Sequence, residues 1–146
     1  MAPATRLPMM KTALIAYLAS GIAMLGIDAV WLSLTASRLY KPQLGDLLLA
    51  KFNAAPAVLF YLLYVFGIVM LAVLPAIAER RATTAILRGA LLGLVAYGTY
   101  DLTNQATLRN WSTLVTVADL CWGTILTACA ATAGYWVATM MASRAG

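Results

Sequence analysis

Four long stretches of this chain contain at most one charged residue each. The first lies between Lys11 and Arg38, the second between Lys51 and Glu79, the third between Arg88 and Arg109, and the fourth between Arg109 and Arg144. A helix that crosses the hydrocarbon core of a bilayer needs about 20 predominantly apolar residues, and each stretch is long enough. The sequence therefore predicts four membrane-spanning helices, over residues 12–36, 54–78, 84–106 and 113–140.

The composition agrees with an integral membrane protein. Hydrophobic residues make up 63% of the 146 residues and charged residues only 10%, whereas about a quarter of the residues of a soluble protein are charged. The connections between the predicted helices are too short for a soluble domain. The helix over 12–36 is too long for the apolar core of a cleavable signal peptide, so we expect it to be retained. We expect one all-α transmembrane domain over residues 1–146, an integral membrane four-helix bundle.

Four crossings place both termini on the same side of the membrane. That side would carry Arg6, Lys11, Arg80, Arg81, Arg88 and Arg144, and the other side Arg38, Lys41, Lys51 and Arg109. This bias of the basic residues favours cytoplasmic termini under the positive-inside rule. The same residues are scattered over the loops and form no basic stripe, so we expect no nucleic-acid partner.

The chain offers no conventional ligand set for a metal or a haem. It has no histidine, and its two cysteines, Cys121 and Cys129, are about 12 Å apart along the axis of one predicted helix. That separation is too large for a disulfide, so we interpret both as small apolar residues. We therefore expect no metal site and no cofactor.

Three aspartates, Asp28, Asp101 and Asp119, lie inside the predicted spans. An aspartate near the middle of a membrane helix costs about 2.5 to 3.5 kcal/mol on insertion scales, so an ionisable residue there is a candidate for function. All three fall roughly 6 to 8 residues from the same membrane surface, about 10 Å deep by helical rise. We expect them to converge, and carboxylates that converge in a low dielectric cannot all stay ionised.

Two of these aspartates begin a D-x-x-W motif. Asp28 is followed by Trp31 on the first span, and Asp119 by Trp122 on the fourth. Residues three apart share a helix face, so each aspartate should lie beside its tryptophan. The second and third spans add polar and aromatic residues at similar depth, and these are Tyr61, Tyr64, Tyr97, Tyr100 and Asn104. The sequence predicts one carboxylate- and aromatic-lined pocket inside the bundle.

A purely structural interpretation stands beside this one. Buried aspartates can serve only as hydrogen-bond partners between helices, and Trp31, Trp111 and Tyr40 have the positions of interface anchors. The counter-charge for the aspartates would come from the loops on the same side, with Arg109 as the nearest candidate and Arg38 and Lys51 as others. The alternatives are a protonated neighbour or a bound cation.

Several local features carry structural expectations. Gly89 and Gly93 form a small-xxx-small pattern that permits close approach of a neighbouring helix. Pro75 should kink or terminate the second span. The leucine-rich stretch 44–52 should either lie flat at the membrane surface as a short amphipathic helix or extend the second span.

Two motifs carry a resemblance to a known family. The segment Tyr100–Trp111 reads Y-D-L-T-N-x-A-T-L-x-x-W, and Asp119–Gly123 reads D-x-x-W-G. With D-x-x-W on the first span, these motifs resemble the bacterial membrane family called domain of unknown function 2177, over nearly the whole chain. In this chain Ser112 follows Trp111 where we expect proline to be common, which puts the start of the fourth span in question. The resemblance implies a small bacterial inner-membrane protein whose relatives often occur near genes for lipid or fatty-acid modification, and it assigns no catalytic residue.

Three functions compete at this point. The first is a membrane protein whose pocket binds or modifies a lipid-like or amphipathic small molecule. The second is proton- or cation-coupled transport by the aspartates in a homo-oligomer. The third is an accessory or structural subunit of a larger membrane complex. In each case membrane lipids are partners.

Overall fold

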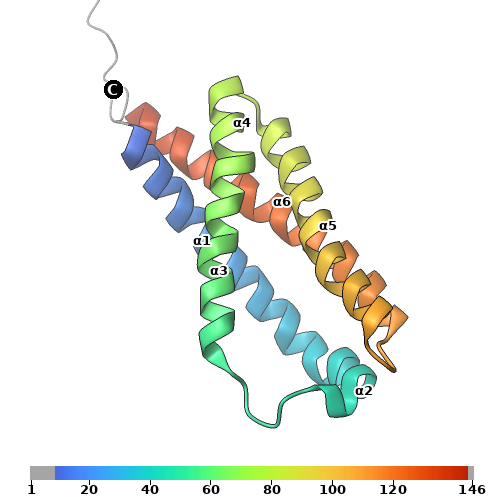
Figure 1. The fold of residues 1–146 in the computed structure, drawn as a ribbon. Helices are drawn as coiled ribbons and strands as arrows, with labels where there is room; N and C mark the ends of the chain where they lie inside the picture. Colours follow the sequence, from blue (N-terminus) through green and yellow to red (C-terminus); the bar gives the residue numbers. More distant parts are fainter. Residues whose placement is uncertain (1–8, 145–146) are drawn as a thin grey trace, which may run out of the picture.

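The computed structural model describes residues 9–144 and forms an all-helical bundle (Figure 1). The elements are α1 (Met9–Thr35), the π-helix η1 (Ala36–Tyr40), α2 (Lys41–Leu44), the 3-10 helix η2 (Gly45–Leu47), α3 (Ala54–Ile68), the π-helix η3 (Val69–Val73), α4 (Leu74–Glu79), α5 (Ala82–Thr107) and α6 (Thr113–Arg144). They join into four continuous helical segments that are long and apolar enough to cross a membrane, which are Met9–Leu47, Ala54–Glu79, Ala82–Thr107 and Thr113–Arg144. The predicted four-helix membrane bundle is confirmed.

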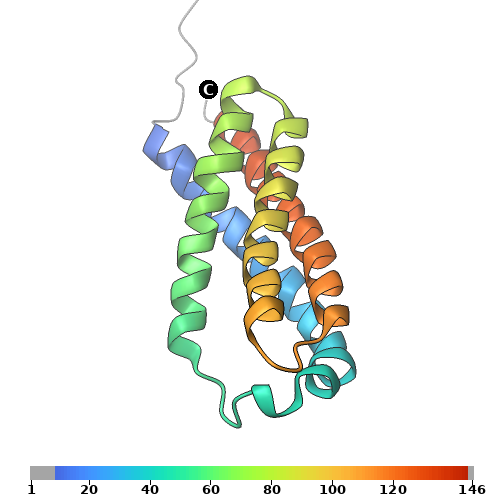
Figure 2. The same cartoon turned by 45° about the vertical axis from the view of Figure 1, so that its right-hand side comes forward.

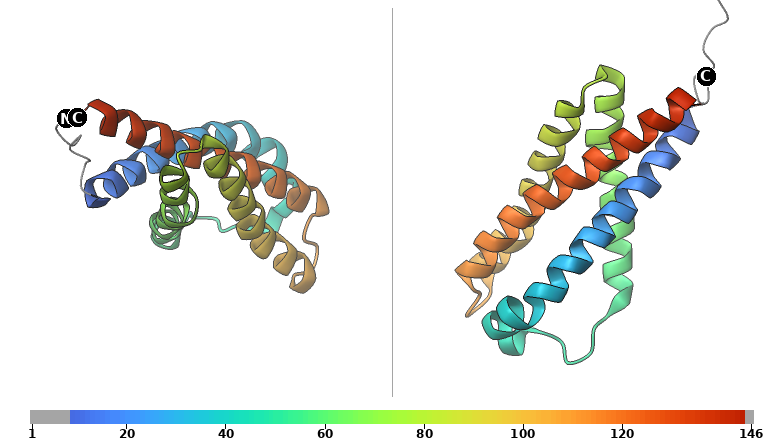
Figure 3. Two further views of the ribbon diagram at one scale, coloured as in Figure 1. Left: turned by 90° about the horizontal axis from the view of Figure 1, so that it is seen from above. Right: turned by 180° about the vertical axis from the view of Figure 1, so that it is seen from behind.

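The beginning of α1 and the end of α6 lie at the same end of the bundle (Figures 1 and 3). This agrees with an even number of crossings. Arg6, which was counted in the charge bias, lies outside the described residues.

The long helix α6 lies between α1 and α5 and packs against both, as the view from behind shows (Figure 3). The contact with α5 is a close approach of the two backbones. A Cβ atom added at Gly93 would overlap the backbone carbonyl of Gly123, and one added at Gly89 would lie 2.9 Å from the backbone oxygen of Thr127. The small-xxx-small prediction is therefore confirmed, because only glycine permits this separation of the helices.

Each π-helix ends two residues before a proline. Residues Val69–Val73 precede Pro75, and Ala36–Tyr40 precede Pro42. Proline lacks the N–H that would bond the carbonyl four residues back, and its ring clashes with that carbonyl. A wider π-helical turn relieves this conflict without ending the helix. The alternative that Pro75 terminates the second span is thus wrong, since the helix continues to Glu79 by way of the π turn.

The leucine-rich stretch 44–52 takes neither of its two expected forms. The first span, predicted to end at residue 36, continues through η1, α2 and η2 to Leu47. Gly45 ends α2 with a φ of 46°, in the left-handed region that favours glycine. Residues 48–53 form an irregular connection before α3. The chain therefore turns back at the end of the first span, and no helical extension precedes the second.

The two halves of the second span have different neighbours. Its second half, η3 and α4, packs against α5, whereas α3 has little contact with α5. In the rotated view the two helices separate towards the 48–53 connection (Figure 2). The outward faces of the helices carry large exposed apolar side chains, among them Leu59, which is 68% exposed, and Leu87, which is 69% exposed. Such a surface fits a lipid environment.

Candidate functional site

Asp28 is buried in α1 and accepts hydrogen bonds from two aromatic side chains. The hydroxyl of Tyr61 on α3 donates to Oδ2. The indole Nε1 of Trp122 on α6 donates to Oδ1 over 3.1 Å. One carboxyl group thus links three helices, and its partners are neutral donors.

Asp119 is buried in α6 and accepts a hydrogen bond from the hydroxyl of Tyr40, at the end of η1. The indole Nε1 of Trp31 in turn donates to the Tyr40 hydroxyl oxygen over 2.9 Å. On the structural interpretation Tyr40 was expected to be an interface anchor, but its hydroxyl bonds the buried carboxyl group of Asp119. Sequence reasoning missed it because the first helix extends past its predicted end and brings residue 40 against α6.

The two D-x-x-W motifs meet through their tryptophans. The rings of Trp31 and Trp122 stack with centroids 4.3 Å apart and an angle of 9° between their planes. Trp122 bonds the aspartate of the other motif, Asp28, directly, and Trp31 reaches Asp119 through Tyr40. The motifs are therefore connected crosswise by hydrogen bonds and by one aromatic stack.

Asp101 on α5 is fully buried, and neither of its carboxyl oxygens accepts a hydrogen bond from a protein donor in the described residues. The charged group beside it is the carboxyl group of Asp119 on α6, and no hydrogen bond joins the two. We call Asp101 and Asp119 the carboxyl pair. Two carboxyl groups close together in a low dielectric do not both stay ionised, so one of the two carries a proton.

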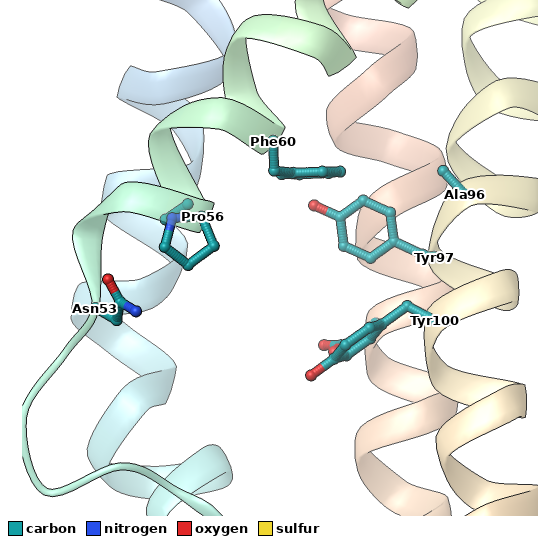
Figure 4. Close-up of a pocket in the computed structure, with 8 residues that line it drawn as sticks. Asn53, Pro56, Phe60, Ala96, Tyr97 and Tyr100 are labelled. Atoms are coloured by element: carbon teal, nitrogen blue, oxygen red, sulfur yellow. The ribbon is translucent and has the colours of Figure 1, made fainter.

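A cavity of about 630 Å³ lies between α3 and α5 (Figure 4), and Asp119 of the carboxyl pair lines it. Aromatic and small apolar residues dominate its walls, and the charged group among the lining residues of the described chain is Asp119. The lining residues are Asn53, Pro56, Ala57, Phe60, Ala96, Tyr97, Tyr100 and Asp119. Phe60 and Pro56 face Tyr97 and Tyr100 across the opening (Figure 4). The cavity exists because α3 diverges from α5 at this end of the bundle.

The predicted pocket residues lie at the cavity, in the hydrogen-bonded network beside it, or away from both. Tyr97, Tyr100 and Asp119 line the cavity, and Asp101 lies against Asp119. Asp28, Trp31, Tyr61 and Trp122 belong to the hydrogen-bonded and stacked network beside it.

The remaining two candidates lie elsewhere. Tyr64 is buried and shares a 2.8 Å hydrogen bond with Thr127 of α6. Asn104 is half-buried on α5 and does not line the cavity.

Arg109 does not serve as the counter-charge. Within residues 9–144 the only salt bridge joins Arg88 and Glu79, whose nitrogen and oxygen are 3.5 Å apart. Arg109 lies in the turn after α5, where it borders a separate surface recess with Asp46 and its neighbours. The expectation fails because the connection after α5, which ends at Thr107, places Arg109 beside residues 42–47 and not beside the buried Asp101.

Trp111 and Ser112 organise the start of α6. The indole of Trp111 donates to the Thr116 hydroxyl over 3.0 Å, and its ring packs edge-on against Tyr100. The hydroxyl of Ser112 accepts a 3.4 Å hydrogen bond from the backbone N–H of Val115. Ser112 therefore acts as an N-cap, and α6 begins at Thr113 as predicted despite the departure from proline.

Sequence reasoning missed Phe60 as well as the smaller lining residues Asn53, Pro56, Ala57 and Ala96. A phenylalanine or alanine in an apolar helix indicates only that the helix lies in the membrane, and it does not mark a cavity residue. Of these residues only Asn53 is polar, so it alone could have been noticed in the sequence. It precedes the predicted start of the second span, and its side chain caps α3.

The family model for domain of unknown function 2177, described as a predicted membrane protein, matches residues 13–136. The matched region includes both D-x-x-W motifs and the Tyr100–Trp111 segment. No curated protein and no solved structure matches the chain.

Proposed function

Since the chain belongs to the membrane protein family called domain of unknown function 2177, we propose that it is a multi-pass protein that binds an amphipathic, lipid-like ligand in the cavity between α3 and α5. The observation that carries the proposal is the carboxyl group of Asp119 in the wall of a cavity whose other lining residues, apart from Asn53, are apolar or aromatic. The polar end of the ligand contacts Asp119, and its apolar part lies against Phe60, Pro56 and Ala96.

The size and lining of the cavity support a small-molecule ligand. Ligand sites are commonly about 300 to 1,000 Å³, mostly apolar, with a few polar groups that fix orientation. The volume here is about 630 Å³, and Asp119 is the charged group among the lining residues. A site made only for packing the helices would be filled by side chains, because protein interiors are close-packed.

The place of the cavity in the bundle supports entry from the lipid phase. The cavity lies between two neighbouring spans, and both carry exposed apolar residues near it, among them Leu59 and Val95, which are 68% and 57% exposed. A ligand with an alkyl chain can therefore pass sideways between α3 and α5 without crossing water.

We propose the bacterial inner membrane as the location, with both termini in the cytoplasm. The support is the family resemblance and the bias of basic residues towards the side of the termini. The cavity then lies in the outer half of this membrane, near the surface opposite the termini.

The cavity can be filled by one substitution. Ala96 lines it from α5, so Ala96→Trp should block ligand entry. Leu94→Trp is the matched control, because Leu94 is on the same helix, 44% exposed, and outside the cavity lining. The measurement is native mass spectrometry of each protein purified in mild detergent, which detects a co-purified amphiphile as a discrete mass increment.

We expect the increment on the wild type and on Leu94→Trp, and its loss from Ala96→Trp at unchanged helical content by circular dichroism. An increment of equal occupancy on all three proteins would place the bound amphiphile elsewhere and refute the proposal.

A further inference from the structure

We infer that the polar end of the ligand is an ammonium group, so that the ligand class is an amphiphilic amine. This inference rests on the proposed function and specifies its ligand. Its basis is the negative charge of the cavity wall, the Asp119 oxygen that accepts no described hydrogen bond, and the aromatic rings that line the same cavity.

The charge of the wall is negative. Asp119 is the charged lining residue, and no Lys or Arg is among the lining residues that the structure describes. A carboxyl pair that shares one proton keeps one net negative charge. The loop arginine expected to neutralise it, Arg109, lies in a separate recess. A single bound cation would supply the missing charge, which is costly to leave uncompensated in a low dielectric.

The carboxyl group in the wall can accept a hydrogen bond from the ligand. Asp119 accepts from Tyr40 at Oδ1, and no described donor bonds its Oδ2. An ammonium carries up to three N–H donors and no acceptor. A carboxylate or phosphate head group offers acceptors and negative charge, so Asp119 would repel it.

Aromatic rings surround the position of the proposed ammonium. Phe60 projects from α3 towards Tyr97 of α5, and Tyr100 lies one turn further along α5 (Figure 4). The face of an aromatic ring attracts a cation within about 6 Å of its centroid, and the attraction grows when water is excluded. An anion gains nothing from the same ring faces.

The experiment compares three probes with the same alkyl chain, which are decylammonium, decanol and decanoate. Each is titrated below its micelle concentration into the wild-type protein in lipid nanodiscs, and empty nanodiscs are used to subtract partitioning into lipid. Binding is measured by isothermal titration calorimetry. The same titrations are carried out on Ala96→Trp, Asp119→Asn, Tyr100→Leu and the control Asp46→Asn, which removes a carboxylate outside the cavity.

We expect decylammonium to bind the wild type at least about tenfold more tightly than decanol, and decanoate to bind most weakly. Asp119→Asn and Tyr100→Leu should reduce this preference, and Asp46→Asn should preserve it. The preference is measured on the wild type, so the test stands even if Asp119→Asn does not fold.

Two other outcomes separate the inference from the proposed function. If Ala96→Trp abolishes binding but decanol or decanoate binds as tightly as decylammonium, the cavity is a ligand site and the ammonium inference is wrong. If Ala96→Trp changes the binding of none of the probes, both the inference and the cavity site are wrong.

Discussion

The indole rings of Trp31 and Trp122 stack almost parallel, with centroids 4.3 Å apart. They come from the first and the last membrane-spanning helices, and each donates its N–H to the network that holds the aspartate of the other helix. The stack therefore fixes the relative position of α1 and α6 at the level of the carboxylates, next to the cavity.

Trp122→Phe removes the indole donor to Asp28 and part of the stacked surface. We expect a loss of about 1 to 2 kcal/mol in the free energy of unfolding, because interhelical hydrogen bonds in membranes contribute modestly and packing is lost as well. Unfolding in mixed detergent micelles measures this. Trp136→Phe is the control, since Trp136 is 52% exposed and forms none of the described side-chain hydrogen bonds. Equal losses for the two variants would contradict the role assigned to Trp122.

Asp101→Asn replaces one member of the carboxyl pair by an amide that can itself donate to Asp119. We expect its unfolding free energy to stay within about 1 kcal/mol of the wild type, because an amide, like a protonated carboxyl group, is uncharged, of similar size and able to donate a hydrogen bond. Asp101→Leu provides no donor and should cost about 1 to 3 kcal/mol more than Asp101→Asn. If the leucine variant is the more stable of the two, the pairing with Asp119 contributes nothing.

Gly93→Ala inserts a methyl group where α5 meets the backbone of α6 at Gly123. The two backbones must separate, so we expect a loss of about 1 to 3 kcal/mol in the free energy of unfolding. Gly26→Ala on α1 is matched in size, and a Cβ there meets nothing within 4 Å. It should cause no loss of stability. A tolerated alanine at position 93 would show that the helices are packed less closely than described.

Ser112→Ala removes the side-chain cap of α6 and its 2.7 Å hydrogen bond to Gln43. Loss of an N-cap typically costs about 1 kcal/mol, and we expect this for the unfolding free energy. Hydrogen exchange of the first turn of α6 should increase at the same time. Ser37→Ala is the comparison, because Ser37 is exposed and outside the described side-chain hydrogen bonds, and its exchange pattern in α6 should match that of the wild type.

The four spans could be predicted because charge inside a membrane is costly and its absence over long stretches is therefore visible in the sequence. The close packing at Gly89 and Gly93 could likewise be predicted from the small-xxx-small pattern that they form. The three aspartates form two groups and not one layer, since Asp28 bonds aromatic donors while Asp101 and Asp119 pair. That division depends on which hydrogen-bond donors of the neighbouring helices lie opposite each carboxyl group. The residue pattern of one helix does not contain this information.

Other features depend on how the backbone departs from a regular helix. Tyr40 reaches Asp119 only because a π turn before Pro42 lets the first helix continue. The cavity exists because α3 diverges from α5, and the divergence is a property of the packing of the second span. Phe60 has no neighbour in the sequence that would mark it as a cavity residue.

Gly123 does not line the cavity, yet it determines how much of the cavity is open. The ring of Tyr97 lies directly over this glycine, in the space that a side chain on α6 would occupy. Any larger residue at position 123 would displace the ring of Tyr97 from α6 and towards α3, into the volume now available to a ligand. On the proposed function, ligand size is therefore limited by a position on the far side of an aromatic ring, where a substitution would change which chain lengths fit while leaving Asp119 in place.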